Sequence, residues 1–328
     1  MPDVMLLGRS DVDALLGIEA CIAAVEAAFG ALGRGEVPPP GVLGVHAAGG
    51  GFHIKAALFS SAAGRYFAAK TNANFPENPH RFGLPTIQGL VLLFDADSGR
   101  PLAVMDSIAL TALRTAAATA LAARHLARPD SRIVTICGCG AQAMAQLKAL
   151  CAVLPLRRAH VVDTDAGRAQ AFAVRAAADT GIAVETAADL RRAARASDVV
   201  VTCTPSRRAL LGPADIAPGT FVAGVGADNP EKQELEPALL ALGTLVVDVL
   251  DQCAVMGDLH HALESGALTR ADVHADLGSI VAGRACGRRT ADEVTIFDST
   301  GMALQDAAAA AAVYEKAGAS DVRRWAPA

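Results

Sequence analysis

An apolar run that passes directly into a glycine-rich turn constrains the fold of this chain more than any other feature. Residues 133–137, Ile-Val-Thr-Ile-Cys, have the β-branched composition of a buried strand, and Gly138-Cys139-Gly140-Ala141-Gln142-Ala143 follows at once. In a G-x-G-x-x-A turn the glycines let the backbone approach a pyrophosphate closely, and the next helix N-terminus provides N–H groups and partial positive charge. A plain tight turn has the same spacing, so the motif needs support from its surroundings.

Asp163 provides that support. It ends the next predicted strand, where a carboxylate can accept hydrogen bonds from the ribose hydroxyls of a dinucleotide. Its negative charge would repel the additional phosphate of NADP, so the sequence favours NAD as the cofactor. Arg168 is close enough in sequence to leave some use of NADP open.

The predicted strands and helices fall into two patterns along the chain. From residue 42 to 105, short apolar runs separated by turn residues predict a sheet with hairpins. A long alanine-rich helix is expected over 108–127, and from 133 to 249 strands alternate with helices, which predicts a parallel doubly wound sheet. Further helices are expected at 11–32 and at about 302–317, and the last one is expected to return to the first domain. The fold class is therefore α/β, with a second domain of the α+β type.

Composition and charge exclude several classes of function. A net charge of −5, without a block of like charges, leaves no basic surface for nucleic acid. No apolar run reaches the roughly 18 residues needed to cross a bilayer, and the first ten residues lack the apolar core of a signal peptide, so a cytoplasmic protein is predicted. The seven cysteines show no paired Cys-x-x-Cys spacing and the histidines no metal-ligand spacing, which argues against a disulfide framework and a metal site.

Four charged residues are candidates for binding an α-amino acid. Arg114 is a lone charge in an otherwise apolar helix, and a guanidinium can bind a carboxylate with two parallel hydrogen bonds. Lys70 and Lys55 lie in predicted strands. Asp228 follows a strand of the nucleotide-type domain at the end where ligands bind, and a carboxylate there can act as general acid or base. Structural explanations are also open: an ion pair for the arginine, a solvated face for the lysines and a turn for the aspartate.

Six segments, in order along the chain, give it a wider resemblance. They are Gly83-Leu84-Pro85-Thr86, Phe94-Asp95 with Gly99, Leu110 to Ala118 around Arg114, Gly138 to Ala143, Val225-Gly226-Ala227-Asp228 with Lys232, and Phe297-Asp298-Ser299-Thr300-Gly301. With these segments the chain resembles, over nearly its whole length, the ornithine cyclodeaminase and mu-crystallin family, which also contains alanine dehydrogenases and reductases of small imines.

The resemblance implies a homodimer with a Rossmann domain in the middle of each chain. Residues 125–301 would form the NAD-binding domain, and residues 1–124 with 302–328 a substrate-binding and dimerisation domain. By analogy, Lys70 and Arg114 would bind the substrate carboxylate and Asp228 would exchange a proton at the amine or imine, so Asp228 and Lys70 are the predicted catalytic residues. Positions expected to touch the dinucleotide or to border its nicotinamide are Thr86, Arg114, Gly138, Gly140, Ala141, Gln142, Asp163, Asp228, Lys232 and Ser299.

The chain departs from the cyclodeaminase pattern at the substrate end. Gly41 stands where cyclodeaminases usually carry an arginine that helps to hold the substrate, and His53 and Lys55 lie in a strand that in those enzymes tends to carry acidic and methionine side chains. A histidine and a lysine would not suit the distal ammonium of ornithine. We therefore expect His53 and Lys55 to line the substrate site, where Lys55 either replaces the missing arginine charge or meets an acidic substrate tail.

The predicted function is NAD(H)-dependent hydride transfer at the α-carbon of a small α-amino or α-imino acid, by an imine reductase or an amino acid dehydrogenase. Two alternatives remain. One is an ornithine or lysine cyclodeaminase that recycles bound NAD within each turnover, and net turnover of NADH separates it from a reductase. The other is a crystallin-like protein that binds a small ligand without catalysis, and the presence of Lys70, Arg114 and Asp228 argues against it.

Overall fold

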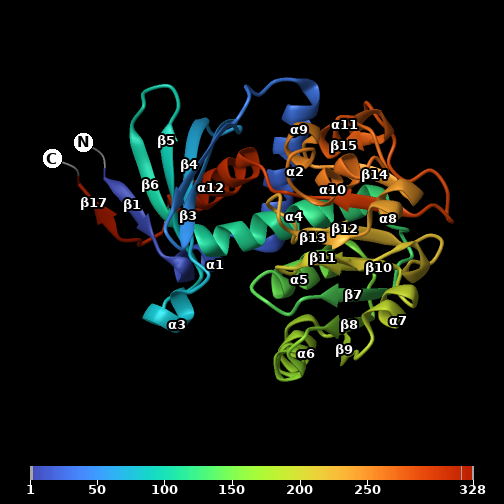
Figure 1. The fold of residues 1–328 in the computed structure, drawn as a ribbon. Coiled ribbons are helices and arrows are strands. Elements are labelled where there is room, and N and C mark those ends of the chain that lie inside the picture. Colours follow the sequence, from blue (N-terminus) through green and yellow to red (C-terminus); the bar gives the residue numbers. More distant parts are fainter. Residues whose placement is uncertain (1–2, 319, 327–328) are drawn as a thin grey trace. The chain divides into compact units, whose positions relative to one another are not determined.

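The computed structural model describes residues 3–318 and 320–326, and the chain divides into two compact units (Figure 1). Unit 1 consists of residues 1–114 and 302–328, and unit 2 of residues 115–301. The boundary lies inside a single helix, α4 (Ser107–Leu126), whereas the sequence-based expectation places it at residue 124, near the end of the same helix. Because the helix is continuous, no turn residue marks the boundary in the sequence.

Unit 1 is built on a seven-stranded sheet (Figure 1). Its neighbouring strands are antiparallel except β1 and β6, which are parallel. The hairpin between β5 and β6 turns where Asp95 accepts hydrogen bonds from the backbone and the hydroxyl of Ser98 and where Gly99 has a φ of 73°. In sheet order the strands are β17 (Arg324–Trp325), β1 (Val4–Leu7), β6 (Pro101–Asp106), β5 (Ile87–Asp95), β4 (Arg65–Asn74), β3 (Gly50–Ser60) and β2 (Gly41–Ala47).

One face of this sheet packs against α12 (Ala303–Ala317), which contacts β3, β4 and β5. Side chains alternate between the two faces along a strand. The buried set on the α12 side consists of Tyr66, Ala68 and Lys70 of β4 and Val91 and Leu93 of β5. The helix is rich in buried alanines, which let it lie close to the strands. On the opposite face, apolar side chains of β2 and β5 are exposed.

Two helices, α1 (Arg9–Leu15) and α2 (Ile18–Arg34), replace the single helix expected over residues 11–32. The backbone is extended at Leu16 and Gly17, which separates them, and α2 packs against α12. The short helix α3 (Asn78–Phe82) completes unit 1. In the ranges 3–318 and 320–326 no single helix combines the length and apolar character needed to span a membrane; one pair, α1 with α2, does so jointly with a bend of 84° between them.

Unit 2 contains the predicted doubly wound sheet, and all eight of its strands are parallel (Figure 1). In sheet order they are β15 (Ala275–Asp276), β14 (Thr244–Val247), β16 (Thr295–Asp298), β12 (Phe221–Gly224), β10 (Val199–Thr202), β7 (Ile133–Cys137), β8 (Arg158–Val162) and β9 (Ala183–Thr186). The order reverses between β7 and β10, and in such sheets ligands bind beyond the carboxyl ends of the strands at this point.

The remaining elements of unit 2 connect these strands. A second, two-stranded sheet pairs β11 (Arg207–Leu211) with β13 (Gln233–Leu235), and neither strand was expected. The helices are α5 (Ala143–Val153), α6 (Ala166–Thr180), α7 (Leu190–Arg195), α8 (Pro237–Leu242), α9 (Leu250–Cys253), α10 (Asp258–Glu264) and α11 (Leu277–Val281), with 3-10 turns at Pro213–Asp215 and Arg270–Asp272.

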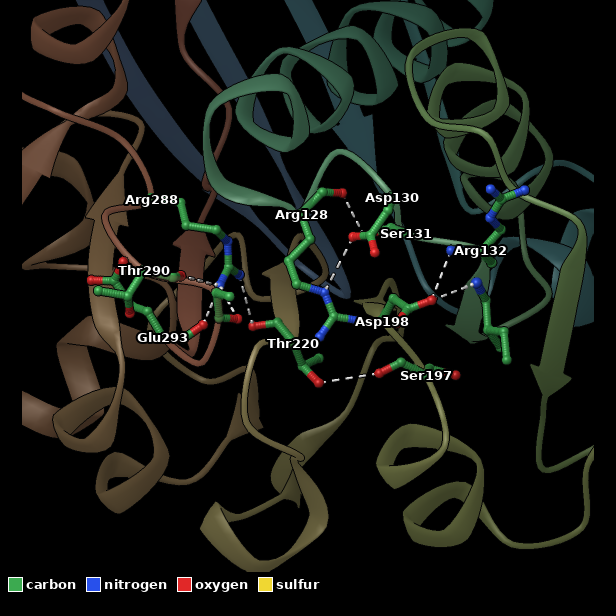
Figure 2. Close-up of polar contacts among 12 residues, drawn as sticks. Arg128, Asp130, Ser131, Arg132, Ser197, Asp198, Thr220, Arg288, Thr290 and Glu293 are labelled. Atoms are coloured by element: carbon green, nitrogen blue, oxygen red, sulfur yellow. Dashed lines mark hydrogen bonds and ion pairs between the residues drawn. The ribbon is translucent and has the colours of Figure 1, made fainter.

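Two arginines link the amino ends of the parallel strands through hydrogen bonds and an ion pair (Figure 2). Arg128 pairs with Asp198, whose other oxygen accepts the N–H of Arg132 at 2.7 Å in front of β7. Arg288 donates to the carbonyl of Thr220, just before β12, at 3.4 Å, and to the carbonyl of Glu293. These contacts satisfy backbone groups where the strands begin, so this edge of the sheet has a structural role.

Candidate functional site

The glycine-rich turn between β7 and α5 has the backbone geometry of a phosphate-binding loop. Gly138 has a φ of 96°, and a Cβ at this position would lie 2.8 Å from the carbonyl oxygen of Cys203, so a side chain is excluded. At Gly140 a Cβ would meet nothing within 4 Å. The second glycine therefore leaves its backbone open to a ligand instead of packing against the protein.

The N-terminus of α5 follows this loop. The first N–H groups of a helix lack partners within the helix and carry partial positive charge. Gln142 is the N-cap residue, its side chain makes no capping hydrogen bond, and its Oε1 is buried without a hydrogen-bond partner among the described residues. Ala141, between the glycine and the cap, is exposed. This helix end can therefore bind an anionic group such as a pyrophosphate.

Asp163, directly after β8, is tied to the glycine turn. Its Oδ2 accepts the N–H of Cys139 at 2.9 Å, and its Oδ1 accepts the N–H of Asp165 at 2.9 Å. Burial acts to raise the pKa of this carboxyl, but the backbone hydrogen bonds and the Arg168 guanidinium, 3.6 Å away, outweigh burial and lower the pKa. The group is a carboxylate at neutral pH and keeps lone pairs for ribose hydroxyls.

These features of unit 2 suit a dinucleotide. The open backbone at Gly140, the helix N-terminus and the ionised Asp163 are the groups that hold a pyrophosphate and an adenosine ribose in doubly wound folds. They lie beyond the carboxyl ends of β7 and β8, next to the reversal of strand order. The fold thus brings Asp163 of the next strand against the glycine loop that continues into Gln142.

Asp228 and Lys232 form an ion pair in the loop after β12. Lys232 Nζ lies 2.7 Å from Asp228 Oδ1, and the Asp228 side chain is 54% exposed. An exposed ion pair of this kind adds little stability. A carboxylate that a ligand can reach, and that an ammonium holds in place, is suited to exchange a proton with that ligand.

Glu234, in β13, holds the start of the loop that carries Asp228. Its carboxylate accepts the N–H of Gly226 at 2.8 Å and both the N–H and the hydroxyl of Thr204 at 2.7 Å. Burial raises the pKa of Glu234, although these donors act to lower it. Sequence reasoning missed this residue, because a single glutamate in a three-residue strand gives no periodic signal.

Further buried carboxylates continue from Glu234 along the carboxyl ends of the strands. Asp258 Oδ1 accepts the backbone N–H of Glu234 at 2.7 Å, and Asp298 accepts backbone N–H groups at the start of α10. Burial, then the nearby charge of Glu234, raises the pKa of Asp258 to about 7. Ser299, predicted to lie near the nicotinamide, is buried with its hydroxyl 3.4 Å from Asp248 Oδ2.

In unit 1, Lys70 and Arg114 converge on one carboxylate, that of Asp306 in α12. Lys70 Nζ and Arg114 Nε each lie 2.9 Å from Asp306 Oδ1, and Arg114 Nη1 donates to Gln305 Oε1 at 2.9 Å. Lys70, Arg114 and Asp306 are only 4%, 5% and 2% exposed. A guanidinium has five N–H donors, so these contacts leave Arg114 with donors for a further carboxylate.

The buried charges of this cluster shift one another's pKa values. Burial lowers the pKa of Lys70 to about 7, and the positive charges of Arg114 and Lys55 act in the same direction while Asp306 opposes them. Burial alone would raise the pKa of Asp306, but Arg114 and Lys70 outweigh it and lower the pKa. Two cations around one carboxylate leave positive charge, which favours an anionic ligand.

The other predicted residues of unit 1 lie on or beside its sheet. Lys55 of β3 is directly opposite Lys70 of β4, and His53 lies two residues away on the same face of the sheet. Lys55 is partly buried, and His53 is exposed. Thr86, just before β5, is partly buried and accepts a backbone hydrogen bond at 2.8 Å.

Sequence reasoning missed Asp306 and Gln305, although a signal was available. They are a polar pair within an alanine-rich helix, and the argument that a lone charge in an apolar helix needs a partner applies to Asp306 as it does to Arg114. The sequence gives no local signal that Arg114 of α4 contacts Asp306 of α12.

The seven cysteines are free, and among the described residues no group of three or more His, Cys, Asp or Glu side chains is arranged to hold a metal ion. Burial raises the pKa of Cys137 and Cys21 to about 12, so both are thiols at neutral pH. They fill space in the core rather than act as nucleophiles.

Comparison with known proteins places this arrangement in a family. Residues 3–321 match the model of the ornithine cyclodeaminase/mu-crystallin family. The chain belongs to this family. Among its relatives are an alanine dehydrogenase of Archaeoglobus fulgidus, 38% identical over 96% of this chain and 95% of the relative, and an iminosuccinate reductase of Paracoccus denitrificans, 33% identical over 96% and 97%.

Solved structures of family members have the same fold. A Δ1-pyrroline-2-carboxylate reductase of Thermococcus litoralis, in complex with NADH and L-proline, has a TM-score of 0.91 and 33% identity, covering 99% of this chain and all of its own. An archaeal alanine dehydrogenase dimer with bound NAD has a TM-score of 0.92 and 35% identity, covering 99% of each chain. The predicted family and the predicted fold, a Rossmann domain with an α+β domain, are confirmed. The predicted reaction class and cofactor are those that the names of these family members state.

Proposed function

We propose that this protein is an NAD(H)-dependent oxidoreductase that acts on the CH–NH2 or C=N bond of a small α-amino or α-imino acid, as an imine reductase or an amino acid dehydrogenase. The observation that carries the proposal is the buried cation pair of Lys70 and Arg114, which share a single carboxylate and retain donors for another. The glycine loop with Asp163 supports NAD as the cofactor, and the charge of Asp163 favours it over NADP.

In this proposal each residue has one task. Arg114 and Lys70 bind the α-carboxylate of the substrate and fix the orientation of its α-carbon. The bound nicotinamide supplies or accepts the hydride. In the reductive direction a C–H bond forms at the α-carbon and the C=N electron pair passes to nitrogen. Asp228 exchanges a proton with that nitrogen. Lys232 holds the Asp228 carboxylate in place.

The proposal is tested by an NADH-oxidation screen with the purified protein. Pyruvate, oxaloacetate and glyoxylate, each with ammonia or methylamine, and preformed cyclic imino acids are offered, and we expect steady NADH consumption with at least one of them. Binding of NADH without oxidation across the whole panel would refute it.

A cyclodeaminase would convert ornithine or lysine without net change in NADH. The strand that carries His53 and Lys55 argues against that activity, because cyclodeaminases tend to carry acidic and methionine side chains there. Conversion of ornithine at constant NADH would decide for it. A crystallin-like binder would show neither activity and would still bind a small ligand.

We further propose that the protein is a homodimer. The sheet face of unit 1 that lies away from α12 exposes apolar side chains: Leu43 is 56% and Leu90 53% exposed. Apolar side chains exposed on one face of a sheet are typical of an interface between subunits. A location in the reducing cytoplasm agrees with seven free cysteines.

A further inference from the structure

The carboxylate of Glu234 connects the segments that follow two neighbouring strands of unit 2, β10 and β12. Its Oε1 accepts the backbone N–H and the hydroxyl of Thr204, both at 2.7 Å, in the segment after β10. Its Oε2 accepts the backbone N–H of Gly226, after β12, at 2.8 Å, and the hydroxyl of Thr202, at the end of β10, at 2.9 Å. One side chain therefore accepts four hydrogen bonds and links the carboxyl ends of two strands.

The surroundings of this carboxylate leave it little freedom to move. Glu234 is 0% exposed, and Asp258 Oδ1 accepts its backbone N–H at 2.7 Å. A Cβ on Gly226 would lie 2.4 Å from the carbonyl oxygen of Thr204 and 2.6 Å from the carboxyl carbon of Glu234, so only a glycine lets the two segments approach this closely. A buried carboxylate whose hydrogen bonds are all made holds the groups around it in one arrangement.

The two segments that Glu234 connects belong to the candidate site. The segment after β12 continues from Gly226 to Asp228, whose N–H donates to the carbonyl of Gly226 at 3.1 Å. The segment after β10 lies against the glycine loop, since a Cβ on Gly138 would be 2.9 Å from Thr204 Cγ2. Glu234 therefore connects the loop that carries the proposed acid–base residue to the loop that can bind a dinucleotide.

From these contacts we infer that Glu234 is a positioning residue for the reaction, which fixes the Asp228 carboxylate relative to the glycine loop. Because Glu234 is buried, it acts through the backbone of Gly226 and not on the substrate. Proton exchange needs the acid or base within hydrogen-bond reach of the reacting atom, and a displacement of ~1 Å is enough to slow a reaction about 100-fold. The inference rests on the proposed function, since it takes Asp228 to exchange a proton with the substrate.

Glu234→Gln breaks this connection while keeping the size of the side chain. An amide has one acceptor oxygen and one NH2 donor group. In either orientation the NH2 group faces a backbone N–H, that of Gly226 or that of Thr204, and this hydrogen bond is lost. We expect kcat to fall roughly 10- to 100-fold. The Kd for NADH should stay within about 3-fold, because Gly140 and Asp163 keep their contacts.

A double-mutant cycle with Asp228→Asn separates positioning from a general structural effect. The experiment measures kcat and KM for NADH oxidation by the full-length protein with a preformed cyclic imino acid, for wild type, both single variants and the double variant. If Glu234 acts by positioning the Asp228 carboxylate, its substitution has no further effect once that carboxylate is gone. The kcat of the double variant should then equal that of Asp228→Asn within about 3-fold. A general structural effect would lower kcat by the same factor in both backgrounds.

Glu231→Gln is the matched control, because it makes the same chemical change in the loop that carries Asp228. The Glu231 side chain is 68% exposed and pairs with Arg207 at 2.8 Å, so its replacement should leave kcat unchanged. Thr202→Val removes one hydroxyl donor and leaves both backbone hydrogen bonds of Glu234 in place, so kcat should fall by less than about 3-fold. If Glu234→Gln does not fold, as urea unfolding shows, Glu234→Asp, which keeps the charge, replaces it in the cycle.

The outcomes separate this inference from the proposed function. An unchanged kcat in Glu234→Gln, or equal losses with and without the Asp228 carboxylate, would overturn the positioning role while wild type still oxidises NADH. An Asp228→Asn protein as active as wild type would overturn it too, because no carboxylate would then need to be positioned. Absence of NADH oxidation by wild type with every imine offered would overturn both.

Discussion

Lys70 Nζ lies 2.9 Å from Oδ1 and 2.7 Å from Oδ2 of Asp306, in the interior of unit 1. In the described part of the chain, Asp306 has the only carboxylate that the structure shows within this distance of the ammonium. Burial nevertheless lowers the pKa of Lys70 to about 7. Near neutral pH the lysine is therefore poised between its charged and neutral forms. A substrate carboxylate favours the charged form.

We therefore expect the kcat/KM for a preformed cyclic imino acid to fall as pH rises above about 7. The free enzyme loses the Lys70 proton in that range and with it part of the attraction for the carboxylate. Lys70→Arg, which stays protonated at all these pH values, should remove this decline even if its activity is lower. The measurement is kcat/KM from pH 6 to 9 for both proteins, and identical profiles would exclude Lys70 as the titrating group.

The two glycines of the nucleotide loop should respond differently to the same substitution. Gly138→Ala places a Cβ 2.8 Å from a carbonyl oxygen on a backbone with a φ of 96°, so we expect it to lower the free energy of unfolding by several kcal/mol and to abolish NAD binding. Gly140→Ala meets open space, so stability should change by less than about 1 kcal/mol while the Kd for NADH rises at least tenfold. Unfolding curves and NADH fluorescence titrations check both, and an unchanged Kd in Gly140→Ala would contradict the assignment of the loop.

Asp228→Asn tests the proton-transfer role. Loss of general acid–base catalysis should reduce turnover by about 100-fold or more, and NADH binding should remain nearly unchanged because Asp228 is an exposed loop residue. Asp179→Asn, at an exposed position of α6, is the control and should leave turnover unchanged. Equal activity of Asp228→Asn and wild type would refute the role.

The buried carboxylates of unit 2 should make the protein less stable as pH rises. Burial, with the charge of Glu234, raises the pKa of Asp258 to about 7, while the unfolded chain ionises near the ordinary value of 3.8. Between these two values the unfolded state binds fewer protons than the folded state, so the free energy of unfolding falls as pH increases. Asp298, whose pKa burial also raises, contributes with the same sign.

Asp258→Asn removes one of these titrations. The loss of stability between pH 5 and pH 8, measured by urea unfolding, should be smaller in the variant than in wild type by ~1 kcal/mol or more. Lys70 titrates in the opposite sense above pH 7 in both proteins and cancels in the difference, which reports Asp258 together with its effect on the neighbouring Asp298. Parallel pH dependences would show that Asp258 is not protonated in the folded protein.

The features that sequence reasoning predicts well are those with a local signal. The strand before Gly138, the glycine spacing and the alternation of strands and helices over residues 133–249 each depend on neighbours in the sequence, and the sheet of unit 2 has them where expected. The break at Gly17 is different, because the apolar periodicity continues across it and only the extended backbone separates the two helices.

Local sequence patterns do not show which residues contact the predicted charged side chains. Arg114 and Asp306 are separated by most of the chain, and their contact depends on the packing of α12 against the sheet of unit 1. Glu234 and Asp258 lie in short elements with no hydrophobic period. Glu234 nevertheless accepts the backbone N–H of Gly226, near Asp228, and Asp258 accepts that of Glu234. Lone polar residues within apolar segments, such as Asp306, are the signal that would have found them.

The exposed sheet face of unit 1 gives a final prediction, on assembly. Leu43 and Leu90 protrude from β2 and β5 on the face opposite α12 and are 56% and 53% exposed in the single chain. If this face joins two copies, a carboxylate at its centre must be buried without a partner, which strongly destabilises an interface. Leu90→Asp should therefore convert the dimer into a monomer in analytical ultracentrifugation at micromolar concentration. Val174→Asp, at a 63% exposed position of α6, should leave the dimer intact, and a dimer that persists in Leu90→Asp would place the interface elsewhere.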